Sequence, residues 1–217
     1  MEQVLEQMVR CAKDEPTARA LADARAHDAP QAVRDVLVAL YLNQDPADSD
    51  LAALGSTALN TVFHLRERPA IHGTLLSEAV TQRNHRWASA LLEAGADPNA
   101  KGSLMAYTVG SEGIFDPRSK PGQFKMDGRP AVPFLELYVA HGGDVRTHAG
   151  GGYGTSPLIR APFNNMAAKM YLLENGADPW SIGPDAPNVV NFGGSLFGDL
   201  VFGARSAENN EEMYRYI

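Results

Sequence analysis

The sequence is poor in cysteine, in basic charge and in long apolar runs. Cys11 is the one thiol among 217 residues, which excludes an internal disulfide. No apolar run approaches the roughly 18 residues that a membrane span needs, and residues 1–6 are acidic and lack the apolar core of a secretory signal. Lys and Arg total 19 against 26 Asp and Glu, a formal net charge of −7. We therefore expect a cytoplasmic chain whose partners include neither membranes nor nucleic acids, because phosphates require clustered positive charge.

One pattern recurs along the chain: an apolar pair, a glycine, a small residue and an aspartate. It is found in residues 90–100 and 171–180, and in a weaker form in residues 137–145. Gly95, Gly142 and Gly176 fall just past predicted helices, where a left-handed backbone is favourable only without a Cβ atom. The aspartate follows in a turn, where its short side chain can accept backbone N–H groups. Three copies of one helix ending predict a repeat architecture.

Segments that resemble one helix opening precede these endings. Residues 154–161 read Gly-Thr-Ser-Pro-Leu-Ile-Arg-Ala, and residues 74–79 are a looser copy, with further openings at 102–104 and 194–196. From about residue 71 onward the chain resembles the ankyrin-repeat family, in which Gly-x-Thr-Pro-Leu-His-x-Ala opens a repeat of about 33 residues. The Thr-Pro-Leu-His core is never intact here. The resemblance implies an all-α solenoid of stacked helix pairs that binds proteins and catalyses no reaction.

The first seventy residues lack the motif but have helical periodicity. Predicted helices cover residues 2–13, 16–26, 30–41 and 49–66. Apolar side chains in the third follow an i, i+3, i+4, i+7, i+8 series, and Gly55 predicts a kink in the fourth. Since end repeats are usually atypical, we interpret residues 1–70 as an N-terminal helical cap of the same solenoid body. Whether one of its helix pairs is a decayed repeat stays open at this point.

Residues 71–217 form the predicted degenerate repeats, and their period is interrupted once. Predicted helices cover residues 86–94, 104–109 and 133–140. Gly142 and Gly176 are 34 positions apart, close to one period, whereas Gly95 and Gly142 are 47 apart. The excess forms an insertion at about residues 110–130 that is rich in Gly and Pro, so a loop is expected there. Insertions often lie on the binding face of a repeat array. The sequence ends inside an incomplete repeat, either as a short capping helix or because it is cut before its natural end; we favour the second.

The sequence offers little for catalysis, cofactors or metals. The glycine-rich segment 150–156 lacks the Lys-Ser/Thr pair of a nucleotide loop, and Phe197 replaces the glycine that a nucleophile elbow needs after Ser195. The six histidines show no metal-ligand spacing, although a structural metal needs about four ligands. We expect no enzyme, no cofactor, no metal and no small-molecule substrate; an enzyme is a distant alternative.

What remains is a surface for binding one dedicated protein. Ankyrin stacks usually bind through their finger tips and concave face, and the resemblance, together with the insertion, carries this role over to these residues: Asn99, Lys101, Phe115, Arg118, Phe124, Lys125, Arg146, His148, Tyr153, Trp180 and Ile182. Tyr153 and Trp180 could instead pack on their own fingers. The acidic charge suits a basic partner, or serves solubility alone. The narrower hypothesis is a bacterial immunity protein that neutralises a cognate toxin; the alternative is an ankyrin-type effector or a regulatory adaptor.

Overall fold

The structure is a computed structural model that describes residues 12–46, 48–65, 68–82, 84–100, 132–146, 156–160 and 166–178. The described part is mostly helical, with one pair of short strands. It divides into two compact units. The first unit covers the described residues up to 100 together with 140–142, and the second covers 132–139 and those from 143 onward. The predicted helix at 104–109, the insertion and all expectations beyond residue 178 lie outside the described residues.

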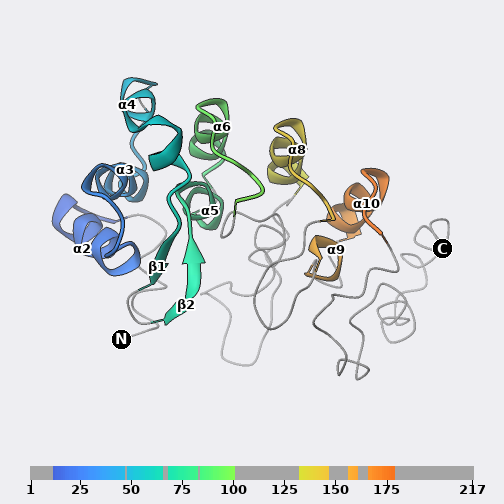
Figure 1. The fold of residues 1–217 in the computed structure, drawn as a ribbon, viewed down its shortest axis with the longest axis horizontal. Helices are drawn as coiled ribbons and strands as arrows, with labels where there is room; N and C mark the ends of the chain where they lie inside the picture. Colours follow the sequence, from blue (N-terminus) through green and yellow to red (C-terminus); the bar gives the residue numbers. More distant parts are fainter. Residues whose placement is uncertain are drawn as a thin grey trace. The chain divides into compact units, whose positions relative to one another are not determined.

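Two helices open the first unit, α2 (Glu15–Arg25) and α3 (Gln31–Tyr41), and they pack side by side (Figure 1). The Asp14 side chain caps α2 by accepting the backbone N–H of Thr17 at 2.9 Å, and Pro16 lies in the first turn, where its missing N–H is harmless. The amphipathic stripe predicted for α3 is confirmed, since its five members are all buried: Val33, Val36, Leu37, Leu40 and Tyr41.

The next segment corrects the sequence-based prediction. Helix α4 (Asp48–Leu59) has the predicted break at Gly55, with φ 67° and ψ 166°, but it ends at residue 59 instead of continuing to residue 66. Two strands follow, β1 (Phe63–Leu65) and β2 (Arg68–Gly73), paired as an antiparallel ribbon with His64 opposite His72. The fold is therefore not purely helical.

Phe63 and Gly73 approach each other closely within this ribbon. Phe63 is fully buried and lies opposite Gly73. A Cβ atom at residue 73 would lie 2.6 Å from the Phe63 ring, so only glycine fits there. At the end of α4 the side chains of Asn60 and Thr61 donate to the carbonyls of residues four positions earlier, which helps to close the helix. Aromatic and β-branched residues after that point favour a strand over a further helical turn.

The second helix pair of the first unit begins at the predicted opening. Helix α5 (Leu75–Thr81) has a reciprocal cap, in which Thr74 Oγ1 accepts the N–H of Ser77 while Ser77 Oγ accepts the N–H of Thr74. Helix α6 (His85–Glu93) begins where Asn84 Oδ1 accepts the N–H of Trp87. Both helices bury apolar side chains, and Trp87 is among the largest fully buried residues. The helix predicted for residues 86–94 is therefore confirmed to within one residue at each end.

The second unit contains three described helices: α8 (Val132–Ala140), α9 (Pro157–Arg160) and α10 (Met166–Glu174). Helix α8 matches the predicted helix 133–140. Helix α9 begins within the predicted opening at 154–161 and contacts α10. Leu158 on α9 and Leu172 on α10 are buried. The predicted opening therefore coincides with a helix start and leads into a helix that ends at the predicted glycine.

Candidate interaction surface

The three predicted helix endings share one backbone conformation. Gly95, Gly142 and Gly176 have φ values of 100°, 83° and 89°. After α6, the Gly95 N–H donates to Leu92 O at 3.0 Å, and the next N–H donates to Leu91 O at 2.9 Å. After α10, Gly176 N–H and the following N–H donate to the equivalent two carbonyls at 3.0 and 2.9 Å. The endings of α6 and α10 thus have the Schellman arrangement, and the positive φ of all three glycines confirms the role predicted for them.

The aspartates after two of these glycines fix the turns that follow. Asp97 Oδ1 accepts the backbone N–H of Asn99 at 2.8 Å, and Asp144 Oδ1 accepts that of Arg146 at the same distance. Each carboxylate therefore satisfies a backbone donor two residues further on, as predicted for this position. All four of these residues are exposed. The turns are held by internal hydrogen bonds while their side chains face solvent.

A fourth ending of the same kind follows α3, and the sequence analysis missed it. Asn43 has φ 54°, its N–H donates to Leu40 O, and the Gln44 N–H donates to Ala39 O, both at 3.0 Å. Asparagine is the residue besides glycine that most readily adopts this conformation. Residues 43–46, Asn-Gln-Asp-Pro, align with Gly-Ala-Asp-Pro at 95–98. The shared Asp-Pro is the signal of this ending in the sequence, and asparagine takes the place of the glycine.

Polar side chains connect the helix endings to neighbouring elements of the first unit. The indole N–H of Trp87 donates to Gln44 O at 2.7 Å, which joins α6 to the ending of α3. The Asn60 amide does the same for the ending of α6: its Oδ1 accepts the N–H of Asp97 at 2.7 Å. The Asn99 amide donates to Gly142 O at 2.9 Å, and both residues belong to the first unit. These endings are therefore internal packing points as well as exposed turns.

Two of the eleven predicted binding residues lie in the described part of the chain. Asn99 is exposed, but its side-chain amide is already engaged by Gly142. Arg146 presents a side chain that is 71% exposed, with Nε 3.6 Å from Asp144 Oδ1. Its guanidinium is therefore the more available of the two for a partner. The other nine residues lie outside the described ranges and stay predictions.

The ribbon carries a cluster that the sequence analysis did not identify. Asp28, in the loop between α2 and α3, accepts the backbone N–H of His64 at 3.0 Å, and its other oxygen lies 2.6 Å from His64 Nδ1. The His72 ring meets the His64 ring edge to face, with centroids 4.7 Å apart. Burial raises the pKa of the Asp28 carboxyl, but the hydrogen bonds from His64 outweigh it and leave the pKa below its usual value. Asp28 thus fastens β1 to the first helix pair.

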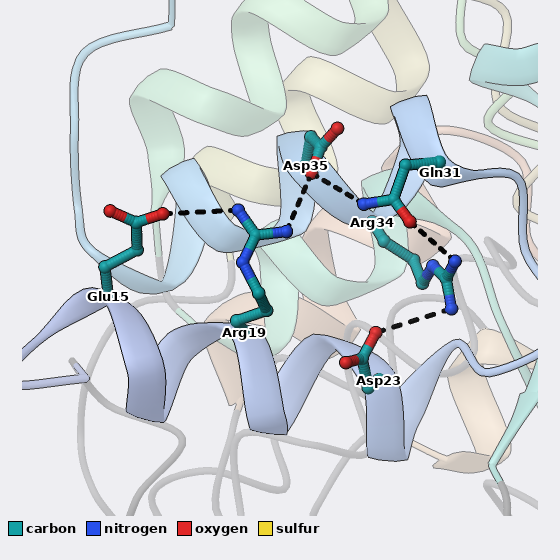
Figure 2. A network of polar contacts seen from close by, with 6 residues as sticks. All are labelled: Glu15, Arg19, Asp23, Gln31, Arg34 and Asp35. Carbon is teal, nitrogen blue, oxygen red and sulfur yellow. Dashed lines mark hydrogen bonds and ion pairs between the residues drawn. The ribbon is translucent and has the colours of Figure 1, made fainter.

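A mixed-charge network covers the exposed side of α2 and α3 (Figure 2). Arg19 on α2 donates to Glu15 Oε1 at 3.2 Å and to Asp35 Oδ1 on α3 at 3.1 Å. Nη1 of Arg34 on α3 lies 3.4 Å from Oδ1 of Asp23 on α2. Both arginines of this network therefore contact a carboxylate on the neighbouring helix, which joins α2 to α3 at the surface.

A buried ionic contact joins three helices of the first unit. Glu78 on α5 is 4% exposed, and its Oε2 accepts the Tyr41 hydroxyl at 3.0 Å and lies 3.3 Å from Arg25 Nε. Burial, reinforced by the Glu78 charge, raises the pKa of the Tyr41 hydroxyl well above its usual value, so the phenol stays a neutral donor. The contact fixes how α2 and α3 pack on α5.

Comparison with known proteins finds no matching family model, no similar curated protein and no similar solved structure. Among the described residues, no three His, Cys, Asp or Glu side chains are grouped so that they could hold a metal ion. None of the helices in the described ranges is both long enough and apolar enough to cross a membrane.

Proposed function

We propose that the chain is a non-catalytic protein-binding module, an ankyrin-like helical solenoid that binds one dedicated partner protein. The observation that carries the proposal is the recurrence of one helix ending with a left-handed residue after α3, α6, α8 and α10, together with an aspartate turn after α6 and α8. Recurring supersecondary units are the mark of repeat proteins, which use their extended surfaces for binding. The ending after α3 supports a repeat series that begins within the N-terminal cap.

The turns are suited to binding because their backbone is already ordered. In the turns after α6 and α8 the aspartate accepts the backbone N–H of the residue two positions further on, and both members of each pair are exposed. A partner that docks on such a turn pays little entropy to order it, which favours affinity. Arg146 is the described residue best placed to contribute, since arginine is a frequent anchor of protein interfaces.

The narrower version of the proposal is an immunity protein that neutralises a toxin. It rests on the acidic charge of the chain, which fits a basic partner met inside the cell. An ankyrin-type effector or a regulatory adaptor is the alternative. The identity of the partner separates these versions: a toxin whose activity disappears on addition of this chain supports the first, and a host or regulatory protein supports the second.

The test starts with affinity capture from the native cell and continues with calorimetry on the purified partner. Arg146→Ala is compared with Arg86→Ala, a matched control in which the arginine also contacts an aspartate, Asp45, that follows a helix ending. We expect a 1:1 complex that Arg146→Ala weakens about tenfold, in the range of an interface anchor, and that Arg86→Ala leaves unchanged. Circular dichroism checks that both variants keep their helix content. Failure of every captured protein to bind in a fixed ratio would refute the proposal.

A further inference from the structure

The ending of α10 differs from the other two glycine endings in the residue that precedes the glycine. Asn175 and Gly176 form the one Asn-Gly pair in the sequence. In the other two endings, alanine and histidine occupy the equivalent position before Gly95 and Gly142. Asparagine is among the thermally labile residues of proteins. A following glycine offers no side chain to hinder attack by its own backbone nitrogen.

The chemistry available to this pair is deamidation, which needs no catalyst. The backbone nitrogen of Gly176 loses its proton to solvent and attacks the side-chain Cγ of Asn175. A C–N bond forms, the leaving Nδ2 takes up a proton from solvent, and the Cγ–Nδ2 bond breaks as ammonia leaves. The resulting five-membered succinimide is then opened by water at either carbonyl. The products are aspartate or isoaspartate at residue 175. The overall reaction consumes one water and releases one ammonia, and no oxidant or reductant takes part.

Both reacting groups are engaged in the folded ending. The Gly176 N–H donates to Leu173 O at 3.0 Å, so the attacking nitrogen is directed back toward its own helix. The Asn175 amide Nδ2 donates to Tyr171 O at 2.8 Å, which holds the leaving group along α10. Asn175 and Gly176 are nonetheless exposed, and nothing lies within 4 Å of the position that a Cβ on Gly176 would take. Water can therefore reach the pair, and two hydrogen bonds restrain it.

We propose that Asn175 is a spontaneous modification site whose deamidation is controlled by opening of the α10 ending. The reaction is slow while the two hydrogen bonds hold and proceeds at the rate of a free Asn-Gly peptide when they break. Helix ends are the parts of a fold that open most readily. The fraction of chains modified at Asn175 therefore increases with the time that the end of α10 has spent open.

Deamidation would destabilise the α10 ending, whose two hydrogen bonds slow the reaction. A carboxylate at residue 175 lies at the C-terminus of α10, where the helix dipole disfavours negative charge. Glu174 and Asp178 already place acidic side chains beside it. An aspartate cannot donate from its side chain to Tyr171 O, so the bond made by Nδ2 is also lost. Isoaspartate would in addition lengthen the backbone at the residue that precedes Gly176.

The test follows deamidation of the full-length chain at mildly alkaline pH, once in buffer and once in concentrated urea. Intact mass spectrometry measures the mass gain, and peptide mapping assigns it to a residue. In urea we expect Asn175 to be modified before any other asparagine. In buffer we expect the same site to react at least about tenfold more slowly, since each tenfold corresponds to about 1.4 kcal/mol of opening free energy.

A matched variant tests whether the helix ending itself provides the protection. Ala94→Asn creates an Asn-Gly pair at the end of α6, where Gly95 makes the equivalent hydrogen bond to Leu92 O. The new pair should also react at least about tenfold faster in urea than in buffer. Rates at Asn175 that agree within twofold in buffer and in urea would overturn the proposal. So would modification of another asparagine first when the chain is in urea.

Discussion

Replacing Gly95 with alanine tests the physical basis of the repeated helix ending. The glycine has φ 100°, a value that residues with a Cβ rarely adopt, and nothing lies within 4 Å of the Cβ that alanine would add. A steric clash with the rest of the fold therefore does not contribute. The whole cost comes from the backbone conformation, which makes this substitution a clean measurement of that cost.

The magnitude follows from two opposing effects. Holding a residue with a Cβ in the left-handed region costs about 1–2 kcal/mol. Alanine also restricts the unfolded chain more than glycine does, which returns about 0.4–1 kcal/mol. The free energy of unfolding should therefore fall by about 1 kcal/mol, roughly a fivefold change in the folding equilibrium. Gly95→Asn should cost less, because asparagine tolerates this region and Asn43 already occupies it after α3.

The assay is urea unfolding followed by tryptophan fluorescence and circular dichroism. We expect Gly95→Ala to lower the midpoint with an unchanged slope, which would indicate a change in stability alone. The urea midpoint of Gly95→Asn should lie between those of Gly95→Ala and the unchanged chain. The reasoning is refuted if Gly95→Ala has the same free energy of unfolding as the unchanged chain, or if Gly95→Ala and Gly95→Asn lower it equally.

Three further predictions concern the first unit. Gly73→Ala places a Cβ 2.6 Å from the Phe63 ring and should lower the free energy of unfolding by about 1–3 kcal/mol, a loss that Phe63→Leu partly reverses in a double-mutant cycle. Tyr41→Phe removes the hydroxyl that donates to Glu78 and should cost about 1.5–3 kcal/mol by urea unfolding, because the acceptor is charged and buried. The third prediction is a pH dependence: Asp28 has a folded pKa below its usual 3.8, so its contribution is present above that pH and is lost as the pH falls through the folded value. The free energy of unfolding should therefore fall less steeply with decreasing pH in Asp28→Asn than in the unchanged chain. The same pH dependence in both proteins would contradict the assignment.

The parts of the fold that follow from local sequence were predictable. Gly95, Gly142 and Gly176 mark helix endings because the left-handed backbone needs glycine, and that requirement is visible without a structure. The apolar series of α3 and the break at Gly55 are likewise local signals. In each case the physical cause acts within one or two helical turns.

The features that were missed depend on contacts distant in sequence or on an unrecognised substitution. Strand β1 was predicted as the last part of a helix because the spacing of its apolar residues fits either structure, and its pairing with β2, with Phe63 opposite Gly73, joins residues too far apart for a local pattern to show. Asp28 and His64 are 36 positions apart, so no local pattern joins them. The ending at Asn43 was hidden because asparagine replaces glycine there. For the candidate site, the pattern predicted the turns that present Asn99 and Arg146, but the bond that engages the Asn99 amide was not visible in it.

The most direct test of the central claim is affinity capture from the native cell with two forms of the chain. One is intact, and in the other residues 111–129 are replaced by a short Gly-Ser linker; mass spectrometry then quantifies the captured proteins. The account predicts one partner in a fixed molar ratio with the intact chain and its loss when the insertion is replaced. Capture of no protein in a fixed ratio by either form would contradict the claim that the chain serves a dedicated partner.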